Sequence, residues 1–127
     1  ANATIADKST ADMVTVTDEG SFVETSSPWN FQNGWATTSG GSITFEMEFK
    51  NLGILYYKTI DGLSGIADIT IDGEQVASID GDFTGGWGSY ATNQEIYTSD
   101  EAAVHTVTVT VQEGDAQNFE VLGWLIS

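Results

Sequence analysis

The sequence contains no cysteine and no arginine, and it has a single proline and a single histidine among 127 residues. Without cysteine there is no disulfide framework, no thiol nucleophile and no cysteine zinc site. The sequence contains three lysines and 19 acidic residues, which gives a formal net charge of −16. Because phosphate contacts need lysine or arginine, nucleic acid is excluded as a partner. The same repulsion disfavours anionic membrane surfaces and acidic polysaccharides.

Long apolar runs are also missing. Nothing approaches eighteen consecutive apolar residues, so no membrane span is expected. The first ten residues, ANATIADKST, contain neither the basic region nor the apolar region of a signal peptide, so no signal peptide is expected within this sequence. No window shows helical periodicity, and there is no internal repeat. The length and the 40% hydrophobic content predict one globular domain spanning residues 1–127.

What the sequence does contain is alternation with a period of two. In Ile66–Ile71, the residues Ala67, Ile69 and Ile71 fall on one face of an expected strand. Asp72-Gly73 then supplies the pair of residues with positive φ that a tight hairpin needs, and Val76–Ile79 is expected to return as the partner strand.

Similar patterns predict strands along most of the chain. They cover Asp12–Thr17, Ser21–Thr25, Ile43–Lys50, Ile54–Ile60, Glu95–Tyr97, Val104–Val111 and Phe119–Ile126. Asn51-Leu52-Gly53 is expected to turn the chain, Ser99–Ala103 to form a turn or one helical turn, and Ser26–Gly41 to be irregular. Eight to ten short strands predict an all-β protein, an antiparallel two-sheet β-sandwich of the jelly-roll kind.

No catalytic residue is predicted. The only histidine, His105, lies in phase with the apolar valines of Val104–Val111 and is expected to be structural, and no Gly-x-Ser-x-Gly motif occurs. A glycosidase needs two carboxylates across a cleft. The pairs Glu46/Glu48 and Asp80/Asp82 instead share one face of a strand, which is typical of a solvated surface.

Metal binding is left open. Ca²⁺ takes six to eight oxygen ligands, and no EF-hand loop is present to supply them. Acidic clusters at Asp18-Glu19, Asp72-Gly73-Glu74 and Asp80-Gly81-Asp82 could still contribute to a structural Ca²⁺. No cofactor is required by any motif.

Aromatic residues on loops give the sharpest hypothesis. Glycine- and asparagine-rich segments carry tryptophans at two separate places, and flat sugar rings stack on indole while amides bind hydroxyls. The alternative is that each ring is tucked into the edge of the core. The predicted stacking residues are Trp29, Trp35, Trp87 and Tyr90. The predicted polar contacts are Asn30, Gln32, Asn33 and Asp82.

Four stretches resemble a known family pattern, namely Gly65–Gly73, Asp80–Phe83, Gly86–Gly88 and His105–Val109. The chain resembles the galactose-binding-like β-sandwich that precedes the SGNH (GDSL-type) domain in secreted bacterial carbohydrate esterases. Sandwiches of this kind also serve as carbohydrate-binding modules of plant-cell-wall-degrading enzymes. The resemblance covers roughly Ile43–Ile126. The catalytic residues of those esterases lie in the following domain, so their activity does not carry over.

The resemblance implies a secreted, non-catalytic carbohydrate-binding module within a larger multidomain enzyme. Its expected partner is a neutral plant cell-wall polysaccharide: β-glucan, xyloglucan or β-mannan. The acidity and the lack of arginine suit the appended modules of cellulosomal enzymes. Two alternatives are a structural accessory domain that packs on an esterase partner without binding sugar, and, less favoured, a free-standing glycan-active enzyme.

Overall fold

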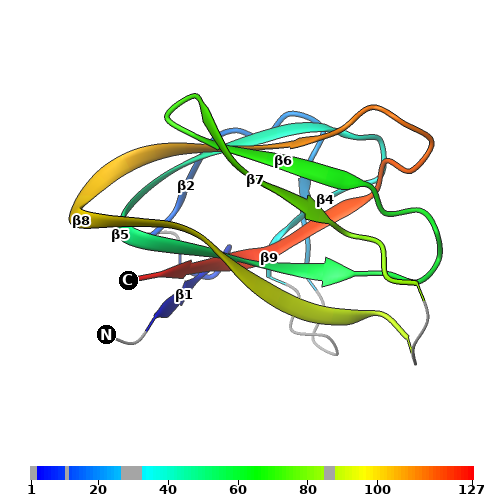
Figure 1. Cartoon of the computed structure of the whole chain (residues 1–127), viewed down its shortest axis with the longest axis horizontal. Helices are drawn as coiled ribbons and strands as arrows, with labels where there is room; N and C mark the ends of the chain where they lie inside the picture. The colour runs from blue at the N-terminus through cyan, green and yellow to red at the C-terminus, as the bar shows by residue number, and fades with distance from the viewer. Residues whose placement is uncertain (1–2, 11, 27–32, 85–87) are drawn as a thin grey trace.

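A computed structural model of the chain describes residues 3–10, 12–26, 33–84 and 88–127, and within these ranges it contains nine strands and no helix (Figure 1). No helix that could span a membrane is therefore found in the described part of the chain. The strands are β1 (Thr4–Ala6), β2 (Thr15–Asp18), β3 (Val23–Glu24), β4 (Trp35–Thr37), β5 (Gly41–Lys58), β6 (Ile66–Ile71), β7 (Glu74–Asp80), β8 (Tyr90–Val111) and β9 (Phe119–Ile126).

The long strands β5 and β8 organise the fold. They pair antiparallel along their whole length, from Gly41 opposite Val111 to Lys58 opposite Tyr90. The register shifts between Phe49 and Asn51, and here both strands bend from one layer of the sandwich into the other. Figure 1 shows β8 curving back on itself at this bend.

The bend leaves backbone groups that the ladder does not pair, and nearby residues satisfy them. The N–H groups of Lys50 and Asn51 both donate to the carbonyl of Ser127, at 2.9 and 3.0 Å. The hydroxyl of Ser99 donates to the carbonyl of Lys50 at 2.9 Å. Because unpaired buried backbone groups are costly, these contacts stabilise the crossing.

Two layers result from this crossing. The first sheet contains β2, the first half of β5, the second half of β8, β6 and β7. The second contains the first half of β8, the second half of β5, β9, β4 and β3, with β1 also paired to β9. Every strand pairing is antiparallel, so the predicted all-β sandwich is confirmed.

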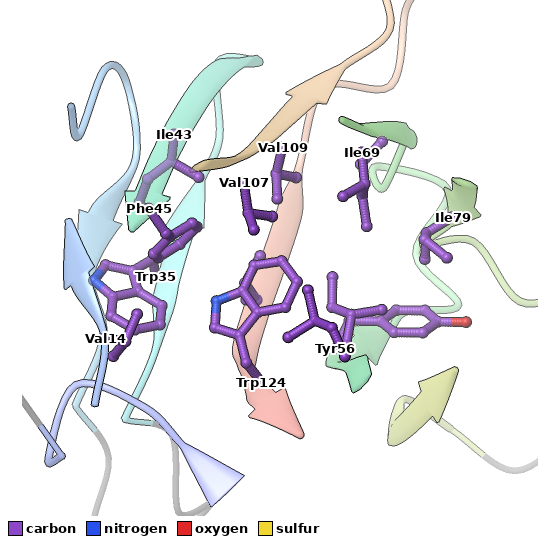
Figure 2. Close-up of a cluster of buried hydrophobic side chains, with 14 of the residues drawn as sticks. Val14, Trp35, Ile43, Phe45, Tyr56, Ile69, Ile79, Val107, Val109 and Trp124 are labelled. Atoms are coloured by element: carbon purple, nitrogen blue, oxygen red, sulfur yellow. The ribbon is translucent and has the colours of Figure 1, made fainter. Parts of the chain in front are cut away.

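The core lies between the two layers (Figure 2). Trp124 is fully buried near its centre, and its ring meets Phe45 edge-on at 5.2 Å between centroids. Val107 and Val109 are buried as their alternation predicts. A register shift between Leu55 and Tyr56 on β5 accommodates an extra residue in β9, which brings Trp124 back onto the inner face.

The hairpin of β6 and β7 forms as the sequence predicts. Ala67, Ile69 and Ile71 are all buried, and Asp72 and Gly73 have φ values of 53° and 85°. This left-handed pair matches the right-handed twist of the strands that it joins.

Three predictions about chain breaks were wrong. Asn51-Leu52-Gly53 does not turn the chain, because β5 runs through it with a bulge. Ser99–Ala103 is neither a turn nor helical, because β8 is continuous there. The segment expected to be irregular contains the short strand β4, which pairs with β9.

Candidate functional site

The loop after β7 is fixed to the end of β5. The N–H of Thr59 donates to the carbonyl of Gly81 at 2.9 Å, and the N–H of Phe83 donates to the carbonyl of Thr59 at 3.0 Å. These bonds form a parallel bridge between Thr59 and Asp82. The side chain of Asp82 is half-buried, and its own N–H donates to the carboxylate of Asp80 at 2.9 Å.

An aromatic pair lies where this loop meets β8. The rings of Phe83 and Tyr90 meet edge-on, with centroids 5.1 Å apart. Tyr90 remains 40% exposed and pairs across the strands with Lys58. Trp87, the centre of the predicted platform, lies outside the described residues. Asp82 and Tyr90 therefore lie on either side of one loop, and both are held next to the end of β5, by Thr59 and by Lys58.

The other predicted loop gives a different result. Trp29, Asn30 and Gln32 lie outside the described residues. Asn33 is half-buried, and its backbone carbonyl accepts a hydrogen bond from the N–H of Lys8 at 2.7 Å.

Trp35 is a core residue and not part of a sugar platform. Only 2% of it is exposed, and its ring meets Phe45 edge-on at 4.8 Å between centroids. Its position in β4, opposite Val121 of β9, turns the side chain inward. A sugar cannot reach a ring that is covered in this way, so the prediction for Trp35 is corrected.

The described ends of the two loops are also separated. In the second sheet β3 and β4 lie on one side of β9, and β5 and β8 lie on the other. Three strand spacings separate β4 from β8, which is roughly 14 Å. Asn33 and Tyr90 therefore do not belong to one compact cluster, and a ligand touching both would have to cross β9 and β5.

Two hollows flank these loops. One, of about 390 Å³, lies between the loops that follow β5, β7 and β8, and none of the described residues that line it is aromatic. Four carboxylates line it: Asp80, Asp82, Glu113 and Asp115. The other, of about 180 Å³, lies over β4, β9 and the end of β5, and it includes Tyr57, Asn118 and Glu120. The sequence reasoning missed these three residues, although two adjacent tyrosines in one strand must face opposite sides.

Within the described ranges, no three His, Asp or Glu side chains are grouped so that they could hold a metal ion. In one of the predicted clusters, the carboxylate already has protein partners. Asp72 accepts hydrogen bonds from Nδ1 of His105 at 2.6 Å and from the N–H of Thr106 at 2.9 Å. In the other two predicted clusters, Asp18 and Asp80 each accept a hydrogen bond from the backbone N–H two residues further along.

His105 belongs to the scaffold, as predicted. Its side chain is only 11% exposed, and its ring lies 4.5 Å from that of Phe49 and 5.3 Å from that of Tyr97, measured between centroids. With the bond to Asp72, it fastens the tip of the β6–β7 hairpin to β8.

The Asp72 contact predicts a pH dependence of stability. The hydrogen bond from His105, and then that from Thr106, lowers the pKa of the Asp72 carboxyl. Because the folded pKa lies below the unfolded value of about 3.9, the stabilisation is complete above that pH and is lost as pH falls through the folded pKa. We expect Asp72→Asn to lower the free energy of unfolding at neutral pH by about 0.5–1 kcal/mol, since the group is half exposed.

Urea denaturation between about pH 6 and pH 2 measures this effect. The free energy of unfolding falls with decreasing pH in proportion to the number of protons taken up on unfolding. Asparagine tolerates positive φ, so the turn is preserved. Asp72→Asn should lose less stability than the wild type as the solution is acidified. The matched control is Asp18→Asn, which also removes one surface charge that binds a backbone N–H. Equal acid sensitivity of wild type and D72N would contradict the expectation.

Solved structures of other proteins share this fold, although sequence comparisons give no match. No model of a protein family matches the chain, and no curated protein sequence is similar to it. Among solved structures, a two-domain esterase active on acetylated mannans, co-crystallised with mannopentaose, is 26% identical with a TM-score of 0.78. That match covers 98% of this chain and 36% of the esterase chain.

Two complete modules also match. The carbohydrate-binding module CBM36 in complex with calcium and xylotriose is 15% identical with a TM-score of 0.57, covering 96% of this chain and 97% of its own. A family 35 carbohydrate-binding module from Clostridium thermocellum is 11% identical with a TM-score of 0.55, covering 100% and 99%. The chain thus has the β-sandwich fold of these carbohydrate-binding modules, and it spans about a third of the length of the esterase that it resembles.

Proposed function

We propose that this domain binds a neutral plant cell-wall β-glycan (β-glucan, xyloglucan or β-mannan) and holds an attached, secreted enzyme against it. The similarity to part of an esterase active on acetylated mannans supports the proposal and favours β-mannan among the three. Trp87 and Tyr90 would stack on sugar rings, and Asp82 would bind hydroxyl groups. Trp29, Asn30, Gln32 and Asn33 would contact the same polysaccharide from the β3–β4 loop.

The charge of the chain supports a neutral ligand. With a net charge of −16 and no arginine, the surface repels polyanions and has no group for bidentate binding of a carboxylate. A neutral polysaccharide experiences no such repulsion. Weak binding is expected, because few side chains share the contact and sugar hydroxyls must be desolvated.

A panel of polysaccharides tests the function. In affinity electrophoresis, glucomannan, xyloglucan or β-glucan should retard the domain, whereas polygalacturonate without calcium should not, because the charges of protein and polymer repel. Each gel is run with EDTA and with calcium, since a module of the same fold binds its ligand with that ion. Retention by polygalacturonate in EDTA at physiological salt, or by none of the neutral glycans, would contradict the proposal.

A second candidate is the accessory domain that packs on an esterase partner. Ile60 and Leu63, on the segment that joins β5 to β6, are 49% and 54% exposed, and Ile66, the first residue of β6, is 38% exposed. Such a group of exposed apolar residues is typical of a contact surface. Fused to its enzyme, the domain would then raise the melting temperature of the catalytic domain while binding no glycan.

A further inference from the structure

A row of four side chains crosses the outer face of the second sheet. Ala91 of β8 lies opposite Tyr57 of β5, and Ala36 of β4 lies opposite Glu120 of β9. Tyr56 pairs with Val121, so the next residues along the two strands, Tyr57 and Glu120, are neighbours as well. The large aromatic ring of Tyr57 thus lies between the small side chain of Ala91 and the carboxylate side chain of Glu120.

Tyr57 faces away from the core. Its neighbour Tyr56 is 5% exposed and lies parallel to Phe119 inside the sandwich, at 6.1 Å between ring centroids. Because successive side chains of a strand point to opposite faces, Tyr57 projects outward, where it is partly exposed. It lines the hollow of about 180 Å³ together with Ala36 and Glu120.

Polar groups of the right kind surround this ring. The side-chain amide of Asn118 lines the same hollow and makes no hydrogen bond within the described part of the chain. Thr38 is exposed at its rim. By contrast, the hydroxyls of Thr37 and Thr59 are already bonded, to Gly40 and to Asp61. An unused amide and a hydroxyl beside an aromatic ring can bind sugar hydroxyls while the ring contacts the sugar face.

The composition of the hollow selects the ligand. No lysine lines it, and its one carboxylate, on Glu120, repels anions. Among the described residues that line the larger, acid-lined hollow there is no aromatic ring.

We propose that Tyr57 is a stacking platform for a pyranose ring of a neutral β-glycan, on the outer face of the second sheet, with Asn118 hydrogen-bonding its hydroxyls. This inference rests on the proposed glycan-binding function and adds Tyr57 and Asn118 to the residues proposed to contact the glycan. Tyr57 lies within β5, and Asn118 directly precedes β9.

Isothermal titration of the 127-residue chain with mannopentaose, and affinity electrophoresis in glucomannan, test the assignment. Tyr57→Ala should weaken binding roughly tenfold or more, the loss typical of an aromatic stack. Tyr57→Phe keeps the ring and should stay within about threefold of the wild type, since the stacking contact is retained. The melting temperature of each variant shows whether its fold is intact.

A blocking variant covers the case in which Tyr57→Ala is unstable. Ala91→Leu places a bulky side chain beside the ring on an exposed edge strand, so the fold is preserved and the platform is covered. Ala102→Leu makes the same change at an exposed position elsewhere on β8 and should bind normally.

The outcomes separate the two proposals. A wild-type protein that binds no neutral glycan refutes the proposed function and this inference with it. A wild type that binds, with Tyr57→Ala folded and equally tight, overturns only the inference. Wild-type affinity in Ala91→Leu would overturn it too.

Discussion

Trp35→Ala is expected to destabilise the domain by about 3–5 kcal/mol, the range measured for removing a large buried aromatic ring. Trp35 is 2% exposed, and its indole fills the space between β4 and Phe45. The short strand β4 cannot move inward to close the cavity without losing its pairing with β9. Small domains are stable by about 5–15 kcal/mol, so the variant would lose a large part of its stability.

Urea denaturation followed by circular dichroism measures this loss. Trp35→Phe, which retains an aromatic ring, should lose less than Trp35→Ala. Glycan affinity per folded molecule should not change in either variant. A Trp35→Ala protein that is as stable as the wild type but binds glycan more weakly would contradict the core position of this side chain and restore it to the platform.

The second large effect is expected on affinity. Trp87→Ala should weaken the binding of glucomannan roughly ten- to a hundredfold while the melting temperature stays near that of the wild type, by analogy with aromatic stacking on nucleobases. In the sequence Trp87 has glycine on both sides and two residues separate it from Tyr90, which is 40% exposed. A glycine-flanked tryptophan allows close approach of a ligand.

Affinity electrophoresis with matched thermal melts checks this expectation. Trp87→Phe serves as the control, since it keeps an aromatic face and should retain most of the affinity. If Trp87→Ala unfolds the domain, the side chain belongs to the core. If it remains folded and binds as tightly as the wild type, the loop after β7 is not the binding surface.

Predictions from the sequence were most accurate where a short pattern of residues is compatible with only one local structure. Asp72-Gly73 needs two consecutive positive φ values, and few backbones other than a two-residue hairpin provide them. The alternation in Ile66–Ile71 and Val104–Val111 predicted their buried faces because only one register hides the apolar side chains. Phe119–Ile126, apolar on both faces, is paired on both sides as a central strand.

Prediction failed where one signal fits two structures. Asparagine and glycine in Asn51-Leu52-Gly53 are typical of a turn, but they also occur at a bulge, and β5 bends there without ending. The residues Ser99–Ala103 have weak strand propensity, and pairing with β5 overrides it. Local patterns carry no information on where a distant strand lies.

The candidate site shows the same limit. Trp35 resembles a loop aromatic because β4 is three residues long, too short for its alternation to be recognised. Tyr56 and Tyr57 are adjacent residues of the same type, so their alternation alone does not show which of them faces the core. Which of the two tyrosine rings faces solvent depends on the strands that pair with β5. Those strands are β8 and β9, and the sequence of β5 alone does not identify them.

The crossing of β5 and β8 also determines how the domain responds to a mechanical load. Since both strands run through both layers, neither layer can unfold and leave the other intact: each shares its central backbone with its neighbour. Local opening is therefore confined to the peripheral strands β1, β2 and β3, which pair over only two to four residues. A polysaccharide pulled against an attached enzyme would load a single cooperative unit, which resists extension until it yields as a whole.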